Sequence, residues 1–298
     1  VAAAAACMAI QSGFQAALMA PTEILAEQHH QSLSRLFAPM GITVGLLTGS
    51  MTAKEKRLTR EALASGQIQV AVGTHALITD STVFNNLGLV IADEQHRFGV
   101  GQRAKLKEKS RQTHLLVMSA TPIPRTLSLI FYGDLDISTM TDKPKQRCEI
   151  LTGIISENKY EDMLKFIDKE LSLSNKAYFV CPKIDGDEEG SLISVKELHE
   201  ELKNRLPFVR FGLLHGKMKD KEKAEVMTAF KNKEYDCLVS TTVIEVGVNV
   251  PNATLMVIED ADRFGLSQLH QLRGRVGRGK DKSYCILTSH NQNTETLQ

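Results

Sequence analysis

Short apolar runs alternate along this chain with segments of mixed polarity. Residues 15–19, 68–72, 87–92 and 115–118 are near-continuous apolar runs. Such runs are typical of strands that are covered on both faces, as in parallel sheets flanked by helices. The alternation of these runs with longer amphipathic segments predicts an α/β fold with doubly wound parallel sheets.

Helix start and stop signals stand between the apolar runs. Thr22 is placed to cap a helix that ends before Gly41, and Thr52-x-x-Glu55 has the spacing of a capping box. Gly66 follows that second segment, where a helix would end before the next strand. The opening residues 1–10 are rich in alanine and predict a further helix.

The chain also matches itself. When it is shifted by 167 positions, identical residues align with almost no slip in register, and one deleted residue later Arg97-Phe98-Gly99 matches Arg263-Phe264-Gly265. The alternative is that two strand–helix–strand units converged on similar strings, which ungapped spacing disfavours. We interpret the repeat as a duplicated domain, because solenoid periods are only about 20 to 50 residues. The aligned identities include Gly45-Leu46-Leu47 with Gly212-Leu213-Leu214, Gly49 with Gly216, Lys54-Glu55-Lys56 with Lys221-Glu222-Lys223, Thr74 with Thr241, and Val90-Ile91 with Val257-Ile258.

A polar, basic segment separates the two copies. Residues 141–147 read Thr-Asp-Lys-Pro-Lys-Gln-Arg and are interrupted by Pro144. We therefore expect a first domain over residues 1–142, a linker over 143–148 and a second domain over 149–298.

Composition narrows the class of protein but names no partner. The chain has 298 residues, 42% hydrophobic and 24% charged, which suits two domains, and its formal net charge is only +1. Its five cysteines form no CxxC pair, which argues against a disulfide framework or a zinc site and favours a reducing, intracellular compartment. The apolar run at 1–10 is far shorter than the roughly 20 residues of a membrane span.

Two adjacent carboxylates follow the apolar run at 87–92. In parallel α/β sheets, ligands collect beyond the carboxyl ends of the strands, and Asp93-Glu94-Gln95-His96 begins there. An aspartate at such a strand end can hold Mg²⁺, while a neighbouring glutamate orients or deprotonates an attacking water. The alternative is an ordinary polar strand end with surface salt bridges.

Two further strings occupy comparable positions. Ser119-Ala120-Thr121 follows the run at 115–118, which would place two hydroxyls beside the carboxylates, or would simply cap a helix near Pro122. In the second copy, residues 268–278 hold three arginines around two glycines, and we expect Arg275 and Arg278 to lie one helical turn apart. Such a pair suits stabilisation of a transferring phosphoryl group, although a solvated basic loop is the alternative.

Together these strings resemble the superfamily-two helicases and translocases, and most closely the bacterial RecG branch. Motif II of the family looks like Asp93-Glu94-Gln95-His96, continued here by residues 97–100, and motif Ia resembles residues 20–23. Motifs III, V and VI are similar to residues 119–121, 240–248 and 268–278. The ordered set is far more specific than any single string and spans nearly the whole chain.

The resemblance implies two tandem RecA-like, P-loop NTPase domains that bind ATP with Mg²⁺ and act on branched DNA such as stalled forks and Holliday junctions. By analogy, Asp93 and Glu94 would form the metal site, Glu94 would activate water, and Arg275 and Arg278 would reach the γ-phosphate. His96, Gly247, Asn249 and Gln271 would line the nucleotide site, while Ser119 and Thr121 would couple it to DNA. The DNA tract would comprise Pro21, Thr22, Gly49, Thr74, His75, Gly216, Thr241 and Thr242.

One motif of the family is absent from the printed sequence. No G-x-x-x-x-G-K-[ST] string occurs, since Gly216-Lys217 precedes Met218 and Gly279-Lys280 precedes Asp281. We therefore expect a first domain truncated at its N-terminus just past the phosphate loop, and a chain that hydrolyses little ATP by itself.

Other readings remain open. The nearest is the motor of a transcription-repair coupling translocase, and a second is a non-catalytic DNA- or protein-binding remnant. A Rossmann dehydrogenase is disfavoured, because no G-x-G-x-x-G opens a helix. The family further implies a bacterial, cytoplasmic and nucleoid-associated protein, with a monomeric motor favoured.

Overall fold

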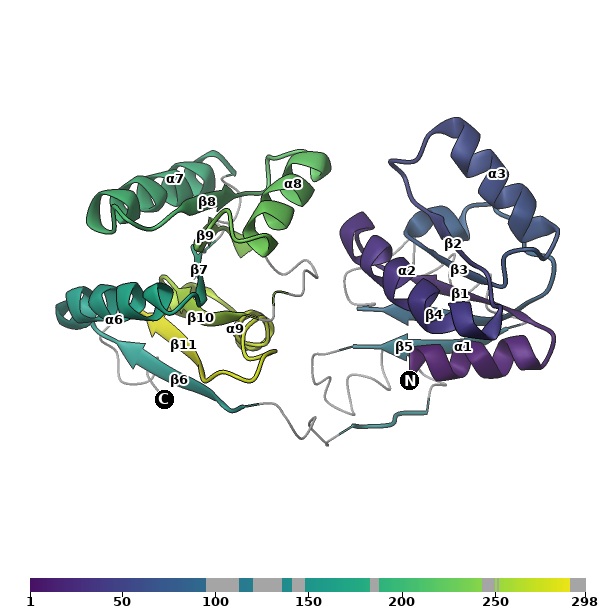
Figure 1. The fold of residues 1–298 in the computed structure, drawn as a ribbon, viewed down its shortest axis with the longest axis horizontal. Helices are drawn as coiled ribbons and strands as arrows, with labels where there is room; N and C mark the ends of the chain where they lie inside the picture. Colours follow the sequence, from purple (N-terminus) through teal and green to yellow (C-terminus); the bar gives the residue numbers. More distant parts are fainter. Residues whose placement is uncertain are drawn as a thin grey trace. The chain divides into compact units, whose positions relative to one another are not determined.

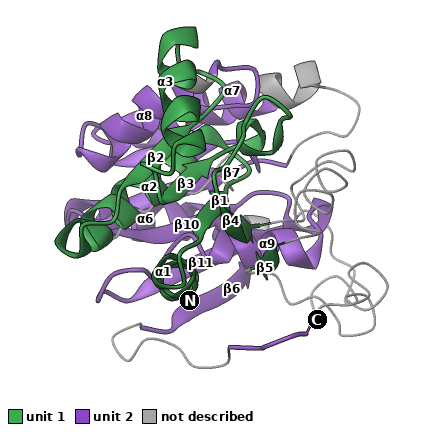
Figure 2. Ribbon diagram, turned by 90° about the vertical axis from the view of Figure 1, so that its right-hand side faces the viewer, with its two compact units in different colours: residues 1–122 green, residues 123–298 purple. Residues whose placement is uncertain are grey.

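The fold is described from a computed structural model of the chain, in which residues 1–94, 113–119, 136–140, 148–182, 188–242, 250 and 252–289 are described. The chain divides into two compact units, Val1–Pro122 and Ile123–Gln298 (Figures 1 and 2). Each unit is an α/β layer structure with its own sheet. The predicted linker at 143–148 lies outside the described residues except for Cys148, and its bounds stay a prediction.

Unit 1 contains a five-stranded, all-parallel sheet in the order β2-β3-β1-β4-β5. Helices α1 and α2 pack on one face, where Phe37 and Leu33 meet Leu18 and Ile91. Helix α3 contributes Leu63 to the core on the opposite face. The elements are α1 (Ala2–Gln11), β1 (Gln15–Met19), α2 (Glu23–Phe37), η1 (Ala38–Met40), β2 (Val44–Leu47), α3 (Ala53–Ala64), β3 (Val70–Gly73), η2 (His75–Ile78), β4 (Leu87–Asp93) and β5 (His114–Met118).

Unit 2 contains a six-stranded, all-parallel sheet in the order β6-β11-β10-β7-β9-β8. Helices α6 and α7 pack on one face, and α8 and α9 on the other. The elements are β6 (Ile150–Ile155), η4 (Glu157–Lys159), α6 (Tyr160–Ser172), β7 (Lys176–Val180), α7 (Glu188–Arg205), β8 (Phe211–Leu214), α8 (Asp220–Lys231), β9 (Cys237–Ser240), β10 (Ala253–Ile258), η6 (Ala261–Arg263), α9 (Leu266–Arg273) and β11 (Ser283–Thr288).

The duplication is visible at the level of single hydrogen bonds. The Thr74 amide donates to the Leu47 carbonyl at 3.3 Å, and the Thr241 amide donates to the Leu214 carbonyl at 3.2 Å. A side chain caps the start of β2 and of β8, because Gln69 Oε1 accepts from the backbone nitrogen of Thr43 and Asp236 Oδ2 from that of Arg210. Each of these pairs obeys the 167-residue shift, so the two units share one backbone plan.

The repeated glycine of β2 and β8 has a packing reason. A Cβ on Gly45 would lie 2.5 Å from Cδ1 of Ile68, and a Cβ on Gly212 would lie 2.8 Å from Cδ2 of Tyr235. Ile68 and Tyr235 are themselves related by the shift and each precedes the neighbouring strand. Any larger residue at either glycine would displace a buried or half-buried side chain, which accounts for the identity.

The helix signals of the first copy are confirmed. Thr22 caps α2 by accepting from the Leu25 amide, and Thr52 with Glu55 forms a complete capping box at α3. Gly66 adopts a φ of +79° after α3, which a glycine adopts without steric cost. The strand predicted at 68–72 begins two residues later, at Val70, because Ile68 packs against Gly45 before the ladder starts.

The Arg210–Asp236 pair yields a prediction about stability and pH. Arg210 donates from Nε to Oδ2 at 2.9 Å and from Nη2 to Oδ1 at 2.6 Å, and these bonds hold the pKa of Asp236 below its ordinary value of 3.8. A carboxyl group whose pKa is lowered by folding stabilises the fold at pH values above its unfolded-state pKa. This stabilisation is lost as the pH falls through the folded-state pKa. We expect Asp236→Asn to lower the unfolding midpoint of unit 2 by on the order of 2 °C at neutral pH, because the pair is partly exposed.

The difference between wild type and Asp236→Asn should shrink as the pH falls from the ordinary carboxyl pKa of 3.8 through the lower folded-state pKa, where the wild-type carboxyl also becomes neutral. Asp162→Asn is the matched control, since Asp162 is 79% exposed and its contact with Lys165 is long, at 3.6 Å. Thermal melts over a pH series measure both variants. A difference that is independent of pH would contradict this account.

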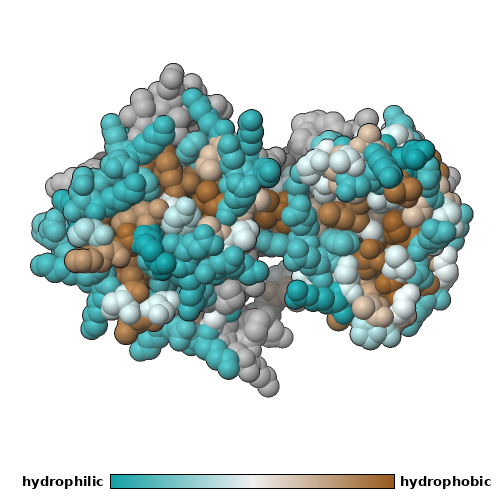
Figure 3. All heavy atoms as spheres, turned by 45° about the horizontal axis from the view of Figure 1, so that its top comes forward, coloured by the Kyte–Doolittle hydropathy of each residue, from teal (hydrophilic) through white to brown (hydrophobic). Residues whose placement is uncertain are grey.

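In the view of Figure 3, hydrophilic residues cover much of the surface of each unit, and patches of hydrophobic residues lie among them. Within the described ranges, none of the helices combines the length and apolar character that crossing a membrane requires.

Candidate functional site

The two carboxylates of motif II close strand β4 at the carboxyl edge of the unit 1 sheet. Asp93 is the last strand residue, in register with Met118 of β5, and the Glu94 amide donates to the Met118 carbonyl at 2.9 Å. Glu94 has a φ of +50°, a left-handed conformation that is uncommon for a residue with a side chain. The chain therefore turns sharply here, and its backbone is held by β5 as it does so.

Ser119 follows Met118 directly, so the structure brings it to the turn that carries Glu94. This agrees with the expected position of motif III beside motif II. The other expected partners, His96 and Thr121, lie outside the described residues.

Asp93 has a partner that the sequence did not reveal. His29 of α2 places Nε2 at 2.8 Å from Oδ2 of Asp93, and the two side chains are only 27% and 19% exposed. Buried Ala26, Leu33 and Phe37 mark the core-facing side of α2, and His29 falls on that side. A histidine at an otherwise apolar position of an amphipathic helix is the signal that could have identified it.

The donor set fits a divalent cation that keeps its waters. Among the described residues, no group of three or more His, Cys, Asp or Glu side chains could enclose a metal. Mg²⁺ is usually held through one or two carboxylates, several waters and substrate phosphates rather than by an all-protein cage. A single aspartate at a strand end, with a glutamate next to it, is compatible with that mode.

The predicted DNA residues of unit 1 gather along the same sheet edge. Pro21 and Thr22 follow β1, Gly49 follows β2, and Thr74 and His75 follow β3. These three strands are adjacent in the order β2-β3-β1. The structure thus places the five residues on neighbouring strand ends. The sequence predicted each strand end but not which strands are neighbours.

Two of these positions differ in how accessible their polar groups are. Thr74 is 4% exposed, and its Oγ1 is buried with no hydrogen-bond partner within the described part of the chain. Gly49 lies in a loop that is fastened to α2, because the Ser50 amide donates to Oε1 of Glu23 at 2.8 Å. Hydroxyls and loop amides at helix N-termini are common contacts to nucleic-acid phosphates.

Unit 2 repeats the arrangement. Gly216 follows β8, and Thr241 and Thr242 follow β9, which is the neighbouring strand. His215 lies between β8 and Gly216, and burial lowers its pKa, with the charges of Lys196 and Lys223 acting in the same direction.

The arginines of motif VI do not lie one helical turn apart. Helix α9 ends at Arg273, Gly274 follows as its C-cap, and Arg275 and Arg278 belong to the turn beyond it. The two residues between the arginines hold this turn in place, since Val276 is fully buried and Gly277 has a φ of +72°. A Cβ on Gly277 would lie 2.7 Å from Cγ1 of Ile150. Both this close contact and the positive φ disfavour any residue other than glycine at this position.

The two arginines differ in their surroundings. Arg275 is half-buried, whereas Arg278 is exposed and donates from Nε to the Gly274 carbonyl at 3.3 Å. Both lie near Tyr178 of β7, where burial raises the phenol pKa and the two positive charges oppose that rise. Gln271 lies on α9 two residues before the helix ends, while Gly247 and Asn249 lie outside the described residues.

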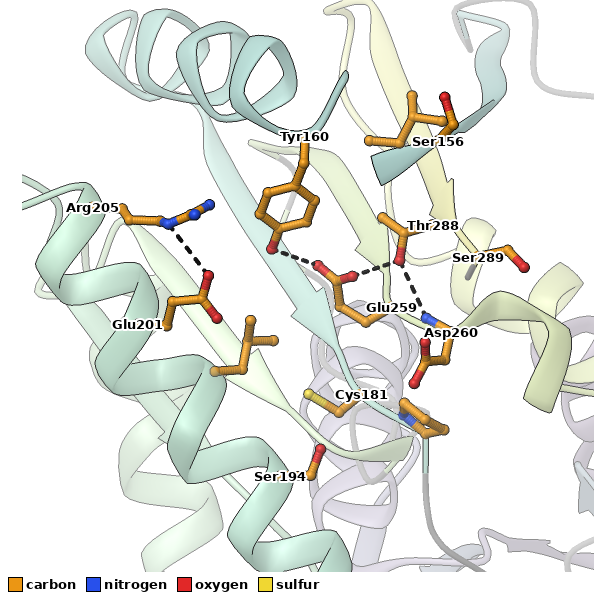
Figure 4. Close-up of a pocket in the computed structure, with 13 residues that line it drawn as sticks. Ser156, Tyr160, Cys181, Ser194, Glu201, Arg205, Glu259, Asp260, Thr288 and Ser289 are labelled. Carbon is orange, nitrogen blue, oxygen red and sulfur yellow. Dashed lines mark hydrogen bonds and ion pairs between the residues drawn. The ribbon is translucent and has the colours of Figure 1, made fainter. Parts of the chain in front are cut away.

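A cavity of about 340 Å³ opens at the carboxyl edge of the unit 2 sheet (Figure 4). Glu259, just after β10, accepts from the Tyr160 hydroxyl at 3.0 Å and from the Thr288 hydroxyl at 2.5 Å. Burial, and then the charge of Glu259, raises the pKa of Tyr160. Asp260 has a left-handed backbone conformation, with a φ of +47°, and its amide donates to the Thr288 hydroxyl. No local feature of the sequence indicates this network.

Comparisons with known proteins agree with the arrangement of the two units. A family model for DEAD/DEAH box helicases matches residues 1–130, and one for the helicase conserved C-terminal domain matches residues 158–280. The ATP-dependent DNA helicase RecG of Staphylococcus epidermidis is 52% identical over 286 residues, which cover 96% of this chain and 42% of that protein. The chain belongs to the RecG-type helicases. The RecG of Aquifex aeolicus is 53% identical over 280 residues, which cover 93% of this chain and 35% of that protein.

Solved structures give the same result for the fold. A structure of RecG bound to a three-way DNA junction has a TM-score of 0.83 at 44% identity and covers 99% of this chain and 38% of that one. The helicase MrfA bound to DNA and AMPPNP has a TM-score of 0.71 at 16% identity, covers 96% of this chain and 43% of that one, and supports the fold alone. The RecG-type chain therefore spans less than half the length of the curated relatives it matches.

Proposed function

We propose that this chain is the motor of an ATP-dependent DNA helicase or double-strand translocase that remodels branched DNA, including stalled forks and Holliday junctions. The observation that carries the proposal is the Asp93-Glu94 turn, held by β5 at a sheet edge, in a chain 52% identical to a RecG helicase. The solved RecG relative was bound to a three-way DNA junction, which supports branched DNA as the substrate.

In this proposal the described side chains divide the work of ATP hydrolysis. Asp93 and Glu94 would hold Mg²⁺ at this strand end. Glu94 orients the attacking water and accepts its proton. When bound, Mg²⁺ neutralises charge that develops on the phosphates. Arg275 and Arg278 donate to the γ-phosphate, while Gln271, with His96, Gly247 and Asn249, lines the nucleotide site.

The DNA side of the proposal rests on the strand ends of both units. Pro21, Thr22, Gly49, Thr74 and His75 of unit 1 would contact the sugar-phosphate backbone, as would Gly216, Thr241 and Thr242 of unit 2. Contacts of hydroxyls and amides to phosphate fix position without reading sequence, which suits a motor that moves along any duplex. Ser119 and Thr121 would couple nucleotide state to this tract. We further propose that the motor works as a monomer in the bacterial cytoplasm, at the nucleoid.

The test uses an exchange protein, in which this chain replaces the 286 matched residues of the Staphylococcus epidermidis relative. That design is chosen because the printed sequence contains no G-x-x-x-x-G-K-[ST] string. We expect the exchange protein to dissociate a labelled three-way junction when ATP and Mg²⁺ are present, and not when ATP is replaced by AMPPNP. An exchange protein that binds the junction tightly but never dissociates it would contradict the proposal and favour a non-catalytic binding module.

A further inference from the structure

We propose that His29 is a positioning residue for the metal-binding carboxylate of Asp93. This inference rests on the proposed function, because it assumes that Asp93 holds Mg²⁺. Nε2 of His29 and Oδ2 of Asp93 are 2.8 Å apart, which is the distance of a strong, charge-assisted hydrogen bond. With Nε2 carrying the proton, the imidazole donates to Oδ2, and Oδ1 remains as an acceptor for a hydrated ion.

The side chain of Asp93 has one hydrogen-bonding side-chain partner in the described part of the chain. Among the described residues, His29 is the only one whose side chain hydrogen-bonds Asp93. A carboxylate at a strand end rotates about its side-chain torsions unless a neighbour holds it, and χ2 of aspartate is broad. Because His29 engages one oxygen, rotation of the carboxylate is restricted before any ion binds.

The helix that carries His29 is itself fixed at both ends. Its first turn is capped by Thr22, and Glu23 accepts from the Ser50 amide at 2.8 Å. Its last residue, Phe37, is 1% exposed in the core between α2 and the sheet. A donor on such an anchored element orients its acceptor more accurately than one on a loop would.

The partial burial of the pair makes the bond worth more than a surface contact. Both side chains are less than a third exposed, so neither oxygen nor nitrogen is fully solvated if the other is removed. Groups that orient metal ligands in this way typically change metal affinity or activity by roughly 10- to 100-fold when they are removed. His29 therefore belongs to the metal site without touching the metal.

The neighbouring His30 offers a matched control. It lies on the same helix and is also half-buried, but its Nε2 lies 3.3 Å from the Val44 carbonyl of β2 rather than from a carboxylate. Substitution of His30 perturbs the same helix and removes the same kind of ring. Only His29 should affect the metal site.

The test compares His29→Leu, His29→Gln and His30→Leu in the exchange protein. We expect His29→Leu to raise the Mg²⁺ concentration for half-maximal ATPase by roughly 10-fold or more. His29→Gln should restore most of the wild-type value, because its amide can place a donor near the position of Nε2. His30→Leu should leave the Mg²⁺ midpoint unchanged. A Mg²⁺ midpoint that does not move in His29→Leu would overturn the inference, as would an equal shift in His30→Leu.

A second readout needs no metal and no turnover. In ring-nitrogen NMR spectra of the 298-residue chain, we expect the His29 imidazole to carry its proton on Nε2 and to respond to Asp93→Asn, while His30 does not. Unchanged His29 resonances in Asp93→Asn would contradict the contact. The two arms also separate failures: an exchange protein with no ATPase at all would refute the proposed function, whereas the NMR result would still decide whether His29 holds Asp93.

Discussion

In the exchange protein, Glu94→Gln should reduce the rate of DNA-stimulated ATP hydrolysis by about 10²- to 10⁴-fold, the usual contribution of a positioned general base. The substitution keeps the size and hydrogen-bonding reach of the side chain but removes its capacity to accept a proton. The backbone should be undisturbed, since the hydrogen bond from the Glu94 amide to the Met118 carbonyl does not involve the side chain. The effect should therefore appear in kcat, with junction binding retained.

Glu27→Gln is the matched control for this variant. Glu27 is an exposed residue of α2 in the same unit, and the change alters net charge equally. Steady-state ATPase assays and fluorescence anisotropy on labelled junction would be run on both variants. If Glu94→Gln hydrolysed ATP as fast as Glu27→Gln, Glu94 would have no part in the chemistry.

Arg275→Ala is expected to lower kcat in the exchange protein by about 10³-fold or more, within the range measured for arginine fingers. The guanidinium would act on charge that develops in the transition state, so KM for ATP should change much less than kcat. Arg275→Lys should not rescue the rate, because an ammonium lacks the planar, two-pronged donor geometry. Arg278→Ala should also reduce kcat.

Arg57→Ala serves as the control for Arg275. Arg57 is 69% exposed and its nearest carboxylate oxygen, on Glu61, is 3.9 Å away. Single-turnover measurements would separate binding from chemistry in each variant. A loss in Arg275→Ala that appeared only as weaker ATP binding would contradict a transition-state role.

Much of the fold could be predicted because local signals and the global pattern agree. Thr22, Thr52 and Glu55 form the helix caps expected of them, and the apolar runs at 87–92 and 115–118 became adjacent parallel strands. The duplication was readable as well, since the same backbone hydrogen bonds recur at a constant shift in sequence. These features depend on residues close in sequence, or on a pattern that occurs twice.

The parts that could not be predicted depend on distant contacts. His29 and Asp93 are separated by 64 positions, and the Tyr160–Glu259 bond spans 99. Nothing near these residues in sequence specifies which helix passes over which strand end. The prediction for Arg275 and Arg278 is wrong for a related reason: helix α9 ends at Arg273, before the pair, and Gly277 between the two arginines packs against Ile150 of a distant strand.

The most direct test of the central claim is the ATPase rate of the exchange protein with and without branched DNA, measured at saturating ATP and Mg²⁺. A DNA-driven motor built on Asp93, Glu94, Arg275 and Arg278 predicts a low basal rate that rises steeply when a three-way junction is added. It also predicts that Glu94→Gln removes this rise while leaving junction binding intact. A folded, junction-binding exchange protein whose ATPase rate is the same with and without DNA would contradict the account.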